Sequence, residues 1–354
     1  MFARNLTRSI HNFLQFGVPA CAIVAVAMFD PNCAIAQTSA LASQNVHTIS
    51  GIVRMQGTGE AVEGAKGRIL RKEDTYVVLG STPTTNGPTP EYLFNTDSNG
   101  RWSVDNLPDG SYVVAVTPGS TDSAQKPGQR FATKKQMIVV AGTDLEGVLI
   151  EVSTGARILG TLVVEGDVPL SSLSVDAMKI DAPFEMVQSV SKSLTPTGKT
   201  TTFTLSNVPE GVIEMNAFLQ TDEHYIKSIT ANGIDLLLEK LNLTSGMDVT
   251  DFKIVVASDL AEFTGRIISE SGKTPLPRMR ISLDWTGKRR VLGGRLTRRV
   301  DEQGAFLLRP PPGEYQVHVW GEPGSARETL PLVKSLPPFT FRPGEHKNME
   351  IRIP

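Results

Sequence analysis

The stretch NTDSNGRWSVDNLPDGSYVVAV, residues 95–116, contains two turn signals and two runs in which apolar and polar residues alternate. In the first turn, Asp97 can accept hydrogen bonds from backbone N–H groups, and Gly100 can supply the positive φ that closes the turn. In the second, Pro108 ends the preceding strand and Gly110 permits a tight return into the next one. Because alternation directs every second side chain to one face, the stretch predicts two short strands joined by this turn.

The same plan recurs twice further along the chain, at a spacing of about one hundred residues. Each copy has an opening strand with an internal glycine, a turn glycine after a proline-bearing loop, and a closing glycine before another alternating run. The opening glycines are Gly51, Gly160 and Gly265, the turn glycines are Gly110, Gly211 and Gly313, and the closing glycines are Gly142, Gly246 and Gly344. Three anchors at one shared spacing predict three copies of a single module.

Many short alternating strands bounded by Gly, Pro, Asn and Asp are typical of β-sandwiches. We therefore predict an all-β protein of three tandem β-sandwich modules, at residues 46–152, 153–256 (the most divergent copy) and 257–354. A weak helical pattern over residues 233–241 predicts either a short helix or a strand there. Tyr112 and Tyr315 are expected to place their rings on the core and their hydroxyls on backbone, as a tyrosine corner does.

The N-terminal segment has the pattern of a secretory signal peptide. Arg4 and Arg8 precede an apolar run at residues 18–29, and an Ala-Ile-Ala cleavage signal ends at Ala36. The apolar run is shorter than the ~20 residues of a membrane-spanning helix. We expect residues 1–36 to be removed, residues 37–45 to form a linker, and the mature chain to be periplasmic or extracellular without a transmembrane span.

Composition narrows the chemistry of the mature chain. Both cysteines, Cys21 and Cys33, lie in the predicted signal peptide, so disulfides, thiolate zinc sites and cysteine nucleophiles are not expected. The whole chain has a net charge of −2, but from Ala257 onward 16 Lys and Arg face 11 Asp and Glu. The last third is therefore the basic part of the protein.

The repeated motifs resemble the carboxypeptidase regulatory-like domain. The resemblance rests on Ser50–Val53, Val62–Ala65, Thr96–Trp102 and Leu107–Tyr112, and on Val300–Phe306 and Pro311–Tyr315 in the third copy. A further segment, His224–Leu238, is similar to one found in exported bacterial proteins that carry several such modules. The resemblance implies a transthyretin-like or Ig-like sandwich with an accessory role and no catalytic residue, and it implies carbohydrate as a ligand class, because some relatives bind it.

Metal sites are not predicted. The histidines of the mature chain, His47, His224, His318 and His346, form no His-x-x-Glu pattern that a zinc peptidase would need. Asp97-Ser-Asn-Gly matches only a fragment of a calcium loop, and the turn described above explains it equally.

Catalytic motifs are also missing from the sequence. It contains neither a Gly-x-Ser-x-Gly nucleophile elbow nor a phosphate-binding glycine loop. We therefore expect no catalytic residue, no cofactor and no enzymatic activity.

The basic stretch near residue 290 is the candidate ligand-binding region. Its residues are Trp285, Lys288, Arg289, Arg290, Arg295, Arg298 and Arg299. The stretch predicts a hairpin that turns near Gly293-Gly294 and holds an acidic polysaccharide, a phosphorylated lipid head or another polyanion. The alternative is a solvated hairpin whose charges guard an edge strand. Trp285 fits either a platform for sugar rings or a core position.

Taken together, these patterns predict a secreted, non-enzymatic binding or scaffolding protein. Its expected partners are a polysaccharide or another envelope protein, and nucleic acid is not expected, because basic and aromatic residues do not interleave. The alternative is a purely structural spacer that presents a partner protein and binds no small ligand. The sequence predicts no oligomeric state.

Overall fold

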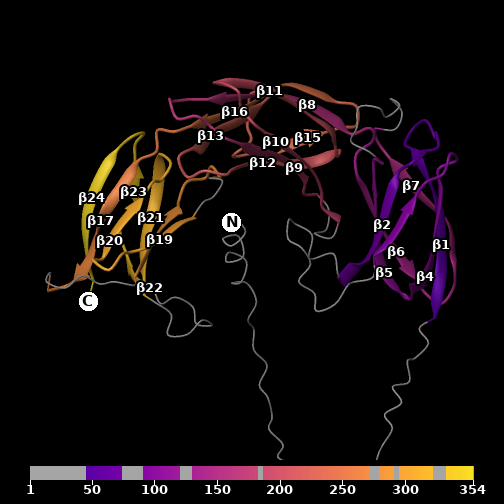
Figure 1. Ribbon diagram of the computed structural model, residues 1–354, viewed down its shortest axis with the longest axis horizontal. Coiled ribbons are helices and arrows are strands. Elements are labelled where there is room, and N and C mark those ends of the chain that lie inside the picture. Colours follow the sequence, from indigo (N-terminus) through magenta and orange to yellow (C-terminus); the bar gives the residue numbers. More distant parts are fainter. Residues whose placement is uncertain are drawn as a thin grey trace, which may run out of the picture. The chain divides into compact units, whose positions relative to one another are not determined.

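The computed structural model describes residues 45–73, 91–119, 130–181, 186–271, 279–290, 295–321 and 332–353. The predicted signal peptide and almost all of the predicted linker lie outside these ranges, as does the Gly293-Gly294 turn. Nearly all regular structure in the described ranges is β-strand (Figure 1). None of the helices found there is long and apolar enough to cross a membrane.

The first sandwich consists of two sheets, with strand orders β4-β1-β7 and β3-β2-β5-β6. Its strands are β1 (Val46–Met55), β2 (Lys66–Arg71), β3 (Tyr92–Asn95), β4 (Arg101–Pro108), β5 (Gly110–Thr117), β6 (Lys134–Val140) and β7 (Leu145–Val152). Inward side chains of both sheets, among them Ile49 and Trp102 of the first sheet and Val114 of the second, form one buried cluster between them.

The second sandwich has strand orders β10-β9-β12-β15 and β11-β8-β16-β13-β14, which Figure 1 shows as two facing layers. Its strands are β8 (Ala156–Val164), β9 (Leu173–Lys179), β10 (Gln188–Leu194), β11 (Thr200–Val208), β12 (Gly211–Leu219), β13 (Tyr225–Ala231), β14 (Ile234–Asp235), β15 (Leu241–Leu243) and β16 (Asp248–Ala257). Residues 233–241 form the two-residue strand β14, a turn and the first residue of β15, so the segment contains no helix and only Ile234, Asp235 and Leu241 lie in strands.

The third sandwich has strand orders β20-β17-β24 and β19-β18-β21-β22, and β23 also pairs with β21. Its strands are β17 (Glu262–Ser269), β18 (Arg280–Trp285), β19 (Arg295–Arg299), β20 (Ala305–Leu308), β21 (Gly313–Trp320), β22 (Leu332–Ser335), β23 (Phe339–Phe341) and β24 (His346–Ile353). The structure thus shows an all-β chain of tandem β-sandwiches, each with its own buried cluster. The module boundaries chosen from the sequence stay a prediction.

All three sandwiches contain the same three-stranded unit. The opening strands β1, β8 and β17 each pair antiparallel with the strand before the turn glycine and parallel with the closing strand. The opening glycine of each copy lies directly opposite an aromatic residue, in the pairs Gly51–Trp102, Gly160–Phe203 and Gly265–Phe306. The aromatic ring occupies the space that a side chain on the glycine would fill. This pairing explains why glycine recurs inside strands, where it ordinarily weakens them.

The turns of the opening stretch form as expected. Asp97 Oδ1 accepts hydrogen bonds from the backbone N–H groups of Asn99 and Arg101, both at 2.8 Å. Gly100 has a φ of 75°, which most side chains disfavour. The next turn carries the chain from one sheet to the other, because β4 and β5 do not pair with each other.

Both tyrosine corners are confirmed. The Tyr112 hydroxyl donates to the carbonyl oxygen of Pro108 at 2.7 Å, and the Tyr315 hydroxyl donates to that of Pro311 at 3.0 Å. Each ring is fully buried in its own core. The hydrogen bond ties the sheet-crossing turn to the strand that follows it.

Candidate functional site

The basic stretch forms a hairpin, but with different arms from those predicted. Strand β18 pairs antiparallel with β19, from Arg280 opposite Arg299 to Asp284 opposite Arg295. Lys288, Arg289 and Arg290 therefore follow the first arm in the connecting loop, and their expected place on a strand was wrong. The reason lies in Arg290, whose backbone N–H donates to a carbonyl of the second sandwich instead of to a strand of its own sheet.

Arg290 is the centre of the contact between the second and third sandwiches. Its backbone N–H donates to the carbonyl oxygen of Leu237 at 2.8 Å. Its Nη2 donates to the carbonyl oxygens of Leu236, at 2.7 Å, and Met215, at 3.1 Å. Its Nη1 lies 2.6 Å from Oε1 of Glu214 and donates to Asn216 Oδ1 at 3.2 Å. One arginine thus contacts three backbone carbonyl oxygens, a carboxylate and a side-chain amide oxygen of the neighbouring sandwich.

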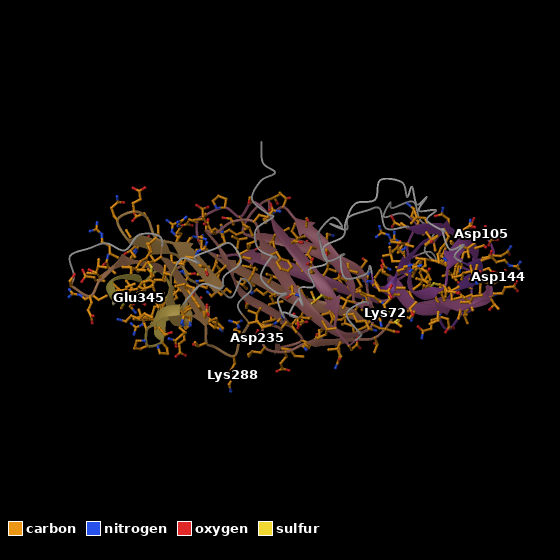
Figure 2. All side chains as sticks on the ribbon, turned by 90° about the horizontal axis from the view of Figure 1, so that it is seen from below. Lys72, Asp105, Asp144, Asp235, Lys288 and Glu345 are labelled. Carbon is orange, nitrogen blue, oxygen red and sulfur yellow. The ribbon has the colours of Figure 1, made fainter. Side chains whose placement is uncertain are left out.

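Arg289 reinforces the same contact. Its Nε lies 2.9 Å from Oδ2 of Asp235, which belongs to β14 of the second sandwich. Lys288 is exposed and projects from the surface in Figure 2. The two neighbouring arginines therefore connect sandwiches, while Lys288 faces solvent.

The remaining candidate residues separate into different environments. Arg298 is largely exposed, and its Nη2 lies 3.5 Å from Oδ2 of Asp222 in the second sandwich. Arg299 is exposed, and Arg295 begins β19. Of the cations whose side chains the structure describes, Arg289 and Arg290 are used by the contact between sandwiches, whereas Lys288, Arg298 and Arg299 are exposed.

Trp285 packs toward the core of the third sandwich, one of the two arrangements that the sequence allowed. Its ring makes an edge contact with Tyr315, with 5.2 Å between centroids, and the backbone of Gly313 lies against the ring. The indole Nε1 is buried and finds no hydrogen-bond partner among the described residues. An indole held in this way offers little surface to a sugar ring.

A cleft of about 440 Å³ lies between the second and third sandwiches. Most of its walls are apolar, and its polar residues include Asp222, His224, Arg298 and Arg309. Its volume falls within the range of about 300–1,000 Å³ that is common for ligand sites. Only Arg298 belongs to the set of residues predicted from the sequence.

Two large apolar residues on the cleft wall are half exposed. Phe218, on β12, is 52% exposed and Leu307, on β20, is 47% exposed. Sequence reasoning missed both, although a signal existed: each occupies an outward position of an alternating strand, where a polar residue is the usual choice. The cleft itself had no sequence signal, because its walls come from two modules.

His224 forms part of the cleft wall and is only 5% exposed. Its Nε2 lies 3.0 Å from the carbonyl oxygen of Val168, which can only accept, so Nε2 carries the proton. Nδ1 is buried and has no hydrogen-bond partner among the described residues. A buried polar atom without a hydrogen-bond partner is destabilising, so this part of the cleft wall is a place where a ligand could supply the missing partner.

The segment that joins the two sandwiches is held on both sides. The hydroxyl of Tyr225, in the second sandwich, donates to Oδ1 of Asp259 at 2.9 Å. The carbonyl oxygen of the same aspartate accepts from the N–H of Gly344, in the third sandwich, at 2.9 Å. Burial and this carboxylate together raise the pKa of Tyr225, so its hydroxyl stays a donor over the physiological range.

Comparisons with known proteins assign no family. No family model and no curated protein matches the chain. Solved structures with some likeness include the Bacillus anthracis TIE protein, a streptococcal ancillary pilin and the major pilin subunit of Bacillus cereus. Their sequence identities are 13%, 10% and 12%, and their TM-scores are 0.23, 0.28 and 0.22. The alignments cover 87%, 88% and 87% of this chain and 51%, 99% and 99% of the respective structures, so the chain spans about half of the first.

Likeness at this level supports no conclusion about function. The resemblance to the carboxypeptidase regulatory-like domain stays a hypothesis from the sequence motifs, and the functional argument has to come from the residues of this chain.

Proposed function

We propose that this chain is a non-catalytic, exported scaffolding protein whose second and third sandwiches act as one rigid piece and present the cleft between them. The observation that carries the proposal is Arg290, which makes five polar contacts across the junction. A flexible pair of modules would need no such contact. A side chain with many bonds and few free rotamers favours one relative orientation.

The joining segment supports the same proposal. Asp259 bonds both to Tyr225 and to Gly344, so the segment between the sandwiches is fixed at its centre as well as at its ends. Ala261, two residues later, is fully buried, and its N–H donates to the carbonyl oxygen of Pro310. Short, bonded and buried linkers transmit orientation, whereas exposed flexible ones do not.

The proposal predicts a narrow distance distribution between the two sandwiches. Because the mature chain is expected to lack cysteine, spin labels can be placed on the exposed positions Thr197→Cys and Gln303→Cys for pulsed electron resonance. We expect one sharp distance in the native protein. Arg290→Gln should broaden the distribution at least twofold, because it leaves Glu214 and two carbonyl oxygens without their donor.

The matched control is Arg266→Gln, which changes an exposed arginine of β17 in the same sandwich. It should leave the distribution unchanged. A broad distribution in the native protein would contradict the rigid scaffold and show that the second and third sandwiches move independently.

Binding of an acidic polysaccharide is the second candidate function, favoured by the exposed cations of the third sandwich. Lys288, Arg298 and Arg299 are all exposed, and the last third of the chain is its basic part. Carbohydrate is also the ligand class that the sequence resemblance implies. On this proposal Lys288 and Arg298 contact the polymer, whereas Arg289 and Arg290 keep the surface in shape.

A glycan array with acidic and neutral polysaccharides tests this second candidate. We expect retention of acidic polymers that falls at least fivefold in the double variant Lys288→Gln, Arg298→Gln and weakens as salt is raised. A control that removes two exposed lysines of the second sandwich, Lys192→Gln and Lys199→Gln, should bind normally. Equal loss in both variants, or no retention at all, would leave the scaffold without a polysaccharide ligand.

A further inference from the structure

Strand β20 ends its sheet beside the cleft, and one of its edges is open. In the strand order β20-β17-β24 it pairs only with β17. The carbonyl oxygens of Gly304 and Pro310 accept from the N–H groups of Ile267 and Ala261, on the side toward β17. The backbone groups of successive residues point to opposite sides of a strand. The N–H and C=O groups of Leu307 and Arg309 therefore point away from β17.

Ala305 also directs its backbone N–H and C=O groups away from β17, but both groups already have hydrogen-bond partners. Both backbone groups of Ala305 bond to Asp301 of the preceding turn. The backbone groups of Leu307 and Arg309 have no partner strand among the described residues. An open strand edge with unpaired N–H and C=O groups is a template for another extended chain.

The side chains around this edge suit an apolar residue. Leu307 and Phe218 are half exposed, and Leu219, Ile226 and Leu296 continue the apolar wall. Most residues of these walls are aliphatic, and Phe218 adds an aromatic ring, so the walls can bury hydrocarbon. The cleft therefore suits an aliphatic or aromatic side chain.

The charges around the cleft favour an acidic partner. Arg298 and Arg309 both line it, against the single carboxylate of Asp222. The Arg298–Asp222 contact is long, at 3.5 Å, and both side chains are largely exposed, so it is worth little. An incoming carboxylate can compete with Asp222 for Arg298 at small cost, and the described residues pair no carboxylate with Arg309.

We propose that the cleft holds an extended segment of a partner protein, added as a strand along the open edge of β20. One apolar side chain of the segment lies between Phe218 and Leu307, and an acidic side chain nearby reaches Arg298 or Arg309. Strand addition takes its affinity from main-chain hydrogen bonds and its specificity from pockets for alternate side chains. The inference rests on the proposed scaffold function, because both walls of the cleft must keep their positions.

A displayed library of random decapeptides, selected on the mature chain, tests the inference. Enriched peptides should share an apolar residue with an acidic one at alternating spacing, and synthetic copies should bind with a Kd of about 1–100 µM. Phe218→Asp and Leu307→Asp should each weaken binding at least tenfold, and Arg298→Gln about fivefold with a smaller salt dependence. Circular dichroism should show that these surface variants remain folded.

N-methylation of the peptide separates strand addition from simple hydrophobic contact. Methylating the amides that face β20, at every second residue of the peptide, should abolish binding. Methylating the amides of the residues between them should change the affinity less than twofold. The matched control is Val139→Asp, which alters a 61% exposed valine of β6, another strand at the end of its sheet. It should bind the selected peptides normally.

Three outcomes would overturn the inference. These are the absence of a shared peptide pattern, equal effects of both methylation sets, and displacement of the peptides by oligosaccharides or by dodecanoate with higher affinity. The distance measurement on Arg290→Gln is independent of these results. If the peptide experiments fail but the native distance is sharp, only the proposed peptide partner is contradicted. A broad native distance would contradict the rigid scaffold as well.

Discussion

Replacing Gly265 with valine is expected to unfold the third sandwich under conditions where the native protein is folded. A Cβ at this position would overlap the carbonyl oxygen of Met349 on β24 and would lie 2.7 Å from Cζ of Phe306 on β20. The carbonyl group of Met349 belongs to the backbone of a strand that pairs with β17, so it cannot move away without disturbing that ladder. We expect a loss of about 3 kcal/mol or more, at the upper end of overpacking effects.

Tryptophan fluorescence can assign this loss to the third sandwich. The chain has three tryptophans, of which Trp285 and Trp320 lie in the third sandwich and Trp102 in the first. In a Trp102→Phe background, a urea titration of Gly265→Val should therefore show an early transition or none. Gly198→Ala is the control, because its added Cβ meets no atom within 4 Å. A Gly265→Val midpoint within error of the native one would show that the strands can separate without cost.

Tyr315 is expected to contribute the largest single side-chain effect in the third core. It is 1% exposed, and its ring meets Trp285 and Phe341 with centroid distances of 5.2 and 5.8 Å. Tyr315→Ala should cost about 3–5 kcal/mol through the cavity it leaves. Tyr315→Phe keeps the ring but leaves the carbonyl oxygen of Pro311 without its donor, and it should cost about 1–2 kcal/mol.

The same residue links stability to alkaline pH. Burial raises the pKa of the Tyr315 phenol above its usual value of about 10. The folded protein then retains a proton that the unfolded chain releases, so this contribution is complete below pH 10 and is lost as the pH rises above it. Tyr315→Phe should therefore show a shallower decline of unfolding free energy above pH 10. Parallel curves for the two proteins would contradict a buried, hydrogen-bonded phenol.

Local rules predicted a large part of the fold from the sequence. Alternation and turn chemistry act between near neighbours, so Asp97 and Gly100 could be assigned to a turn before any tertiary contact was known. The repeat of opening, turn and closing glycines predicted three related units, and the structure shows the same three-stranded unit in each sandwich. The tyrosine corners were predictable for the same reason, because each bond spans only four residues.

The candidate site was less accessible to sequence reasoning. Lys288, Arg289 and Arg290 are adjacent in the chain and chemically alike, yet one faces solvent and two bind the neighbouring sandwich. Their partners Glu214 and Asp235 are more than fifty residues away. A run of like charges carries no information about which distant carboxylates and carbonyls will approach it.

By itself, the amino-acid order of this protein determined its all-β character, its threefold repeat and the chemistry of its turns, because these follow from backbone preferences and from the period of two along a strand. Only the tertiary structure decided that Arg290 binds one sandwich to another, that Trp285 packs toward a core, and that Phe218 and Leu307 line the same cleft. Those arrangements depend on how separate modules dock, and docking is governed by complementarity between surfaces that no local pattern encodes.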